Sequence, residues 1–234
     1  ILKEDLTVGV DTNDNAVFNG NVNIENTDLV IRGTDLDPMS IGRGGGAVST
    51  NTRMGVSALA ANTSGSQNTA FGYQALLTNN VGASNTAIGN RALRVAGIAS
   101  NNIAIGKDVM LVTLSGSKNV AIGNNAMESN QTGSANVCIG HYAGYDILGD
   151  GNVLIGPADN ETSADATFRP PNISGDRQLV IGSGGQAWIR GDSNYDVTLS
   201  NDLTVNANTL IKGNLVVNGT TCLLYTSDAA DDMQ

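Results

Sequence analysis

A short pattern of apolar and polar positions recurs along the middle of the chain, between residues 51 and 156. Each unit opens with Asn, continues through three residues that alternate apolar or β-branched with mostly small side chains, and then reaches a Gly. These glycines are Gly55, Gly72, Gly89, Gly106, Gly123, Gly140 and Gly156. Five of the six intervals between them are 17 residues and the last is 16. Such regular self-similarity indicates a stacked repeat fold.

The length of the unit indicates β-structure. Seventeen residues are too few for a helical-hairpin repeat, which needs roughly 33. Asn, Gly and Ser separate the apolar runs, which is typical of short strands joined by turns. We therefore predict an all-β fold, a parallel β-solenoid or β-roll of about seven 17-residue coils, stacked about 4.8 Å apart.

Stacking of the units aligns three columns of residues. The first contains Thr52, Thr69, Thr86, Ile103, Val120, Val137 and Val153, and the third contains Met54, Phe71, Ile88, Ile105, Ile122, Ile139 and Ile155. Because side chains alternate along a strand, these two columns share a face, which we predict to be the interior. The column between them contains Arg53, Ala70, Ala87, Ala104, Ala121, Cys138 and Leu154. We predict that this smaller column faces outward, either against a neighbouring chain or toward solvent.

The recurring polar and glycine positions have structural interpretations. The leading residues Asn51, Asn68, Asn85, Asn102, Asn119, Asn136 and Asn152 predict a ladder of stacked Asn side chains, because Asn readily bonds backbone groups at turns. The repeat Gly predicts a bend with positive φ or a crowded backbone. Cys138 is interpreted as a buried free thiol.

The flanking segments divide the chain into further regions. Residues 1–47 read as a strand–turn shaft segment, 48–160 as the solenoid, 161–200 as a loop with a terminal coil and cap, and 201–221 as further shaft strands. Within 161–200, residues 178–182 echo the repeat, and Trp188 is a candidate plug over the open end of the stack. Residues 222–234 resemble a translated sequencing-library adapter, so we treat them as an artefact.

Composition narrows the classes of partner. The chain has 234 residues, 4% aromatics and a net charge of −10, which suits a solenoid with a thin core. The acidic balance argues against nucleic-acid binding, which needs Lys and Arg for phosphate contacts. No run of 18 apolar residues occurs in the sequence, so we predict no membrane insertion.

The sequence offers weak candidates for catalysis or metal binding. The one histidine, His141, follows a repeat Gly and is expected to be an exposed coil residue. Asp11, Asn13 and Asp14 faintly resemble a cation loop, but the Gly and terminal Glu of an EF-hand are missing. Asp146 and Asp150 read better as a turn. We predict no enzymatic activity, no cofactor and no metal.

Three units carry a resemblance to known proteins: NTAFGYQAL from Asn68, NTAIGNRAL from Asn85 and NVAIGNNAM from Asn119. They resemble repeats of bacteriophage tail-fibre proteins, especially of marine phages, and are similar to head repeats of trimeric autotransporter adhesins. The resemblance implies a homotrimer in the virion that contacts other tail proteins and a host-surface glycan or protein. The alternatives are a bacterial surface adhesin and a tail spike that depolymerises a surface polysaccharide.

Residues at variable positions after each repeat Gly are the candidate host-contact residues. They would lie on the outer corner of each coil, where the repeat imposes no single residue type. The set comprises Tyr73, Gln74, Asn90, Arg91, Lys107, Asp108, Asn124, Asn125, His141 and Tyr142.

Overall fold

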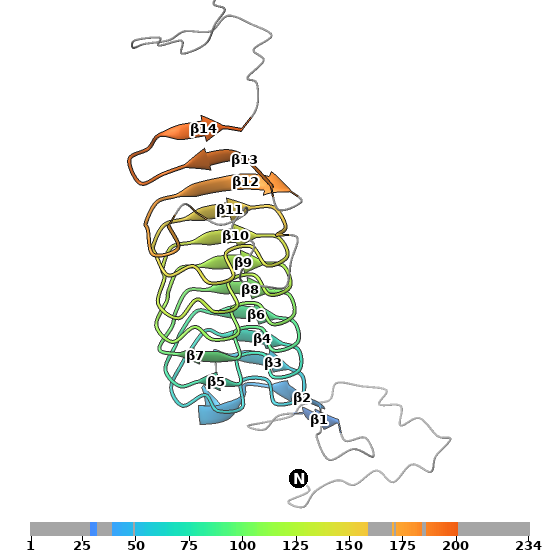
Figure 1. Ribbon diagram of the computed structural model, residues 1–234. Helices are drawn as coiled ribbons and strands as arrows, with labels where there is room; N and C mark the ends of the chain where they lie inside the picture. The colour runs from blue at the N-terminus through green and yellow to red at the C-terminus, as the bar shows by residue number, and fades with distance from the viewer. Residues whose placement is uncertain are drawn as a thin grey trace, which may run out of the picture. The chain divides into compact units, whose positions relative to one another are not determined.

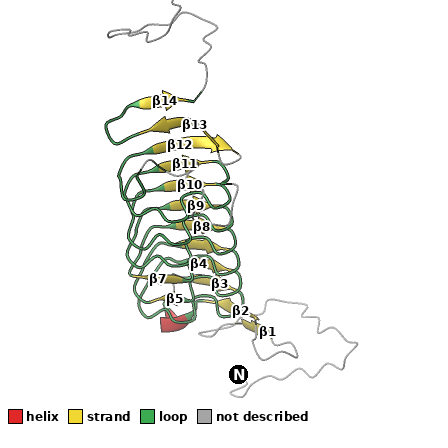
Figure 2. Cartoon of the chain, in the orientation of Figure 1, coloured by secondary structure: helices red, strands yellow, loops and turns green. Residues whose placement is uncertain are grey.

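The computed structural model describes residues 29–31, 39–48, 50–158, 170, 172–183 and 186–200. These residues form a parallel β-solenoid, which confirms the predicted fold class (Figure 1). Among them there is no α-helix, and the one helical segment is the short 3₁₀ turn η1 (Gly45–Ala47), drawn red in Figure 2. The predicted shaft segments lie mostly, and the residues from 201 onward entirely, outside the described residues.

The seven predicted repeat strands are present and in register. They are β3 (Thr52–Met54), β4 (Thr69–Phe71), β6 (Thr86–Ile88), β8 (Ile103–Ile105), β9 (Val120–Ile122), β10 (Val137–Ile139) and β11 (Val153–Ile155). Each pairs in parallel with the next at the equivalent residue, so six coils separate the first strand from the last. Strands β5 (Thr78–Asn79) and β7 (Val95–Gly97) form a second, two-stranded sheet.

Additional strands extend the main sheet at both ends. At the start, β1 (Leu29–Ile31) and β2 (Met39–Gly42) add in antiparallel fashion to β3. At the other end, β12 (Leu179–Ser183) pairs in parallel with β11, which confirms the terminal coil predicted from the sequence echo. Antiparallel strands β13 (Gln186–Gly191) and β14 (Val197–Leu199) complete twelve strands (Figure 1).

Trp188 does not plug the end of the stack, so that prediction is wrong. Its side chain is 55% exposed. The physical reason is the course of β13, which pairs with the edge of β12 and extends the sheet instead of folding across the open coil. The side chain of the preceding residue, Ala187, is the one that is buried.

The interior of the coil is lined by the small middle column, which reverses the predicted assignment of the two faces. Ala70, Ala87, Ala104, Ala121 and Cys138 are at most 1% exposed. The two apolar columns lie on the outside of the sheet, and the expected contact between the alanines and a neighbouring chain is therefore wrong.

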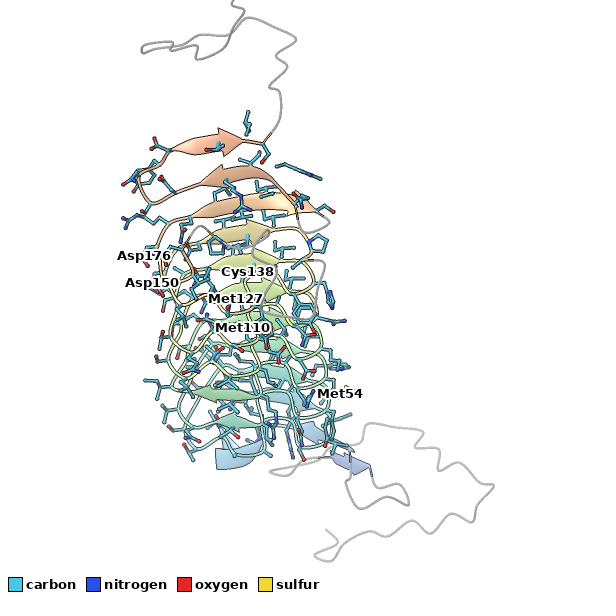
Figure 3. All side chains as sticks on the ribbon, in the orientation of Figure 1. Met54, Met110, Met127, Cys138, Asp150 and Asp176 are labelled. Carbon is cyan, nitrogen blue, oxygen red and sulfur yellow. The ribbon has the colours of Figure 1, made fainter. Side chains whose placement is uncertain are left out.

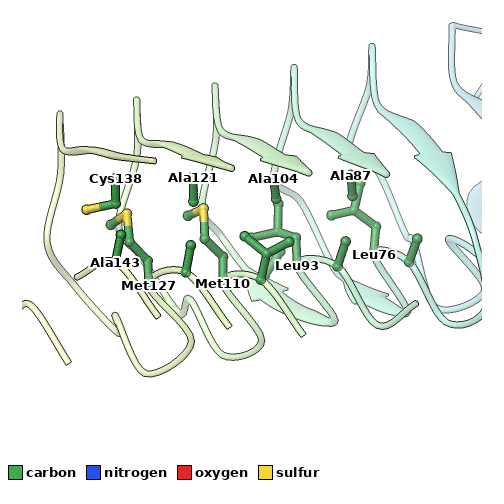
Figure 4. Packing of buried hydrophobic residues seen from close by; sticks show 14 of the residues in the cluster. Leu76, Ala87, Leu93, Ala104, Met110, Ala121, Met127, Cys138 and Ala143 are labelled. Carbon is green, nitrogen blue, oxygen red and sulfur yellow. The ribbon is translucent and has the colours of Figure 1, made fainter. Parts of the chain in front are cut away.

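The opposite wall of the coil explains the reversal. Its fully buried long side chains are Leu59, Leu76, Leu93, Met110 and Met127. These side chains fill the coil from the far wall, so the strands can contribute little more than a methyl group (Figure 4). A larger side chain in the middle column would overpack the core unless the far wall became smaller.

One coil shows this exchange of volume directly. Cys138 replaces the usual Ala, and Gly144 replaces the Leu or Met of the far wall. A Cβ at Gly144 would overlap the Cys138 sulfur, so the larger residue on one wall requires the smaller one on the other. Cys138 is a buried free thiol, as predicted, and its burial raises its pKa.

The Asn ladder is confirmed, and each rung from Asn68 to Asn152 bonds both neighbouring coils. Asn102 shows the pattern: its backbone N–H donates to Oδ1 of Asn85 at 3.0 Å, and its Oδ1 accepts the N–H of Asn119 at 2.9 Å. Its Nδ2 also donates to the carbonyl of Gly116 at 3.0 Å. At the end of the ladder Gln178 takes the same place, with its N–H bonded to Asn152.

The repeat glycines occupy the strained and crowded bend that the sequence predicted. Their φ angles lie between 130° and 139°, a region that side-chain-bearing residues rarely adopt. At Gly106 a Cβ would also come within 2.6 Å of the carbonyl oxygen of Gly123.

We predict that Gly106→Val lowers the free energy of unfolding by at least about 2 kcal/mol, because it combines backbone strain with a clash against the next coil. Urea unfolding at fixed chain concentration measures the loss. Asn90→Val is the matched control, since Val56 occupies the equivalent position one residue after the Gly. Equal stability of the two variants would contradict this account of the bend.

We predict a loss of roughly 2–5 kcal/mol for Asn102→Ala, because it leaves the buried N–H of Asn119 and the carbonyl of Gly116 without their partner. Asn90→Ala removes the same atoms from an exposed position and should change stability by no more than about 0.5 kcal/mol. Calorimetric unfolding of both variants checks the difference. A loss at position 102 as small as the one at position 90 would show that the ladder contributes little.

Candidate interaction surfaces

The outer face of the main sheet is an apolar surface. Side chains that stack along it are 36–50% exposed in the described structure: Phe71, Ile88, Ile103, Ile122, Ile139 and Ile155. They come from the first and third columns of the repeat, in strands that lie about 4.8 Å apart. Contiguous apolar surface is typical of sites of interaction. We call it the apolar face.

The apolar face continues beyond the repeats. The pairing register places Ile155 beside Ile181, Ile181 beside Ile189, and Ile189 beside Leu199. At the other end, Met54 lies beside Ile41. The same column therefore runs from β2 to β14, although the strand direction reverses at both ends.

The apolar face changes in character along the stack. Its first column is polar and β-branched at Thr52, Thr69 and Thr86, and becomes apolar from Ile103 to Leu179. Its third column is apolar throughout. The two ends of the face therefore differ: only the third column is apolar near β3, whereas both columns are apolar toward β12.

The predicted host-contact residues gather along one corner of the solenoid, directly after the strands of the apolar face. One column is exposed and contains Tyr73, Asn90, Lys107, Asn124 and His141. The next contains Gln74, Arg91, Asp108, Asn125 and Tyr142, whose φ angles all lie between 54° and 57°. We call these two columns the corner ridge. The structure thus brings the ten residues into one continuous strip.

Asp108 differs from the rest of the corner ridge because it is only 4% exposed. Its Oδ2 accepts a hydrogen bond from Nη2 of Arg91 at 2.7 Å, and Nε of Arg91 lies 2.6 Å from its Oδ1. This hydrogen bond, followed by the charge of the carboxylate, raises the pKa of Arg91. Asp108 therefore holds Arg91 in place across two coils.

The corner ridge has a basic part and an aromatic part. Lys107 and Arg91 lie at its centre, with Arg94 alongside, whose Nε donates to Oε1 of Gln74 at 3.2 Å. Farther along, the rings of His141 and Tyr142 meet edge to face with centroids 4.4 Å apart. The ring centroid of Tyr145 lies 5.7 Å from that of Tyr142. Sequence reasoning missed Tyr145, although its spacing of three residues from Tyr142 offered a signal.

The acidic residues near the end of the solenoid take part in turns. The N–H of Ser134 donates to Oδ1 of Asp150 at 2.6 Å, and the N–H of Asp150 donates to Oδ1 of Asp176 at 2.7 Å (Figure 3). Within the described ranges, no three His, Cys, Asp or Glu side chains gather as a metal site. The weak cation loop at Asp11, Asn13 and Asp14 lies outside those ranges. The described segments also contain no helix suited to spanning a membrane.

Comparisons with known proteins add no family to these observations. No family model, curated protein or solved structure matches the chain. The resemblance to tail-fibre and adhesin repeats stays a prediction. What the protein does is inferred from the apolar face and the corner ridge.

Proposed function

We propose that the chain is a structural segment of a phage tail fibre, in which three copies pack through their apolar faces and support host recognition. The observation that carries this proposal is the position of the apolar columns outside a coil whose interior is already full. The resemblance of the repeats to tail-fibre sequences supports the placement in a phage tail fibre and the number of three chains.

Burial of the apolar face offers a driving force for association. The coil does not need these side chains for its own core, because alanines and the far wall fill it. Covering a half-exposed Ile or Val contributes roughly 1 kcal/mol, and the columns repeat that gain at every strand. A solenoid that stayed alone would keep this surface in water.

The first column of the apolar face changes from threonine to apolar residues along the stack, and this change favours an assembly in which the copies run in the same direction. In a parallel, in-register arrangement, Thr69 of one copy lies level with Thr69 of the other copies, and Val137 lies level with Val137. An antiparallel arrangement would place the threonine end of one face against the apolar end of another. Parallel copies around a common axis form a closed cyclic assembly, which suits a fibre.

The corner ridge supports a role at the host surface. It lies beside the apolar face, so three packed copies would present three ridges outward along the fibre. The rigid stack would hold a receptor-binding tip away from the virion, and the ridges would supply additional contacts. The same geometry suits the head of a bacterial adhesin, for which a membrane anchor in the full-length protein would be diagnostic.

We predict that light scattering gives a mass of three chains for the 234-residue protein, and that Ile122→Asp with Ile139→Asp yields folded monomers. Each carboxylate would have to be buried without a partner in the assembly, which is costly. Circular dichroism should show that the β-structure remains, because both positions lie outside the coil core.

The matched control places two carboxylates on the corner ridge, as Asn90→Asp with Asn124→Asp, and should leave the mass unchanged. A wild-type chain that is a stable monomer would refute assembly through the apolar face. A trimer that persists in the Ile122 and Ile139 double variant would assign the contact to another surface.

A further inference from the structure

The fold does not explain the aromatic cluster that His141 and Tyr142 of the corner ridge form with the adjacent Tyr145. His141, Tyr142 and Tyr145 form a continuous group of rings in a chain with only 4% aromatic residues. The equivalent residues of the preceding coil, 17 positions earlier in the sequence, are Asn124, Asn125 and Glu128. Since the earlier coil has the same backbone course with polar residues, stacking of the coils does not require rings at these positions.

The backbone beneath the rings is fixed by bonds to the neighbouring coil. The N–H of Tyr142 donates to the carbonyl of Asn124 at 3.0 Å, and the carbonyl of Tyr145 accepts the N–H of Ser129 at 2.8 Å. The N–H of Tyr145 also donates to the carbonyl of Tyr142 at 3.2 Å. The rings are therefore presented from a preorganised backbone, which lowers the entropic cost of binding a ligand.

A row of hydrogen-bonding groups lies next to the rings. Asn124, Asn125 and Glu128 occupy the same columns one coil away, and Nδ2 of Asn125 donates to Oε2 of Glu128. His141 is exposed and both tyrosines are partly exposed. Apolar ring surface and polar side chains thus face the same solvent region, as in sites that orient a small polar ligand.

The coil that carries the rings departs from the regular repeat. It is one residue shorter than the coils before it. Its core contains Cys138 in place of Ala, Gly144 in place of Leu or Met, and Ile147 in place of a polar residue or Ala. These core changes fit one another, as the contact between Cys138 and Gly144 shows. The repeat pattern is therefore relaxed at the coil where three rings gather on the surface.

We propose that His141, Tyr142 and Tyr145, with Asn124, Asn125 and Glu128, form a binding site for a saccharide unit of a surface polysaccharide. A pyranose ring has an apolar face of C–H groups and a rim of hydroxyls. The apolar face matches the tyrosine rings, which combine an apolar body with a polar end, and the hydroxyls match the amides and the carboxylate.

Charge narrows the class of sugar. Glu128 lies beside the rings and Asp146 follows Tyr145 directly, whereas the cation of the corner ridge that is nearest to the rings, Lys107, lies two coils from His141. Such a surface disfavours a sugar with a carboxylate or phosphate group. The site therefore favours neutral sugars and amino sugars. This inference rests on the proposed role in host recognition and specifies the ligand of the corner ridge.

The test is binding of the 234-residue protein to an array of purified bacterial polysaccharides and lipopolysaccharide oligosaccharides that includes neutral, amino-sugar and acidic members. We expect binding to at least one neutral or amino-sugar member. Tyr142→Ala with Tyr145→Ala should weaken it at least tenfold, and Tyr142→Phe with Tyr145→Phe, which keeps the rings, should retain more of it. His141→Ala is a second variant that should weaken binding. It removes an exposed ring and should have little effect on folding.

Tyr195→Ala is the matched control, because Tyr195 is an exposed tyrosine that lies between β13 and β14, outside the corner ridge. Its binding should equal that of the wild type. The inference is overturned if no glycan binds, if only acidic glycans bind, or if the tyrosine variants bind as well as the control. A trimeric protein with a blank array refutes only the saccharide site, whereas a monomer that binds refutes only the assembly.

Discussion

Each coil is joined to the next by a buried asparagine, whose side-chain oxygen accepts the backbone N–H of the equivalent asparagine in the following coil. Asn102 uses its amide oxygen for the following coil and its amide nitrogen for a turn in its own coil. The seven Asn positions and Gln178 are at most 4% exposed, so water cannot replace these bonds. This ladder and the parallel pairing of the strands hold equivalent residues of successive coils in register, and the positions of the repeat glycines, the core and the outer columns depend on that register.

A narrow interior follows from this construction and determines which side chains face outward. Met110 and Met127 cross the coil from the far wall and leave space for Ala104 and Ala121 on the strands (Figure 4). The Ile and Val columns are consequently placed on the outer face, where they are exposed in a single chain. A small core and an apolar exterior are thus two consequences of one geometry, and association of copies through that exterior is the proposed result.

The period, the parallel register, the Asn ladder and the bend at Gly106 could all be predicted from sequence, because each follows from local residue types that repeat. The orientation of the strands could not. Alternation separates Ile122 from Ala121 but does not identify the inner face, and the usual preference for large apolar residues inside gave the wrong answer. The deciding quantity is the width left by residues such as Met127, which only the packed coil reveals.

The contacts within the corner ridge also could not be predicted from the sequence. Variation after each repeat Gly identified Tyr142 as a surface residue, but the pairing of its ring with Tyr145 depends on the path of the corner. The burial of Asp108 depends on Arg91 in the preceding coil. Interactions between coils are set by three-dimensional stacking, so a linear pattern could propose the surface but not its internal contacts.

The relation between the two faces of one strand is tested most directly by thiol alkylation at neighbouring positions of β10. One protein keeps Cys138 and carries Cys222→Ser; the other carries Cys138→Ala, Ile139→Cys and Cys222→Ser. Position 138 should be protected at every protein concentration, because it lies inside the coil and its pKa is raised by burial. Position 139 should be protected only where chains associate and should react quickly on dilution. Rapid reaction at position 138 in the folded protein, with lasting protection of position 139 in a monomer, would contradict the arrangement described above.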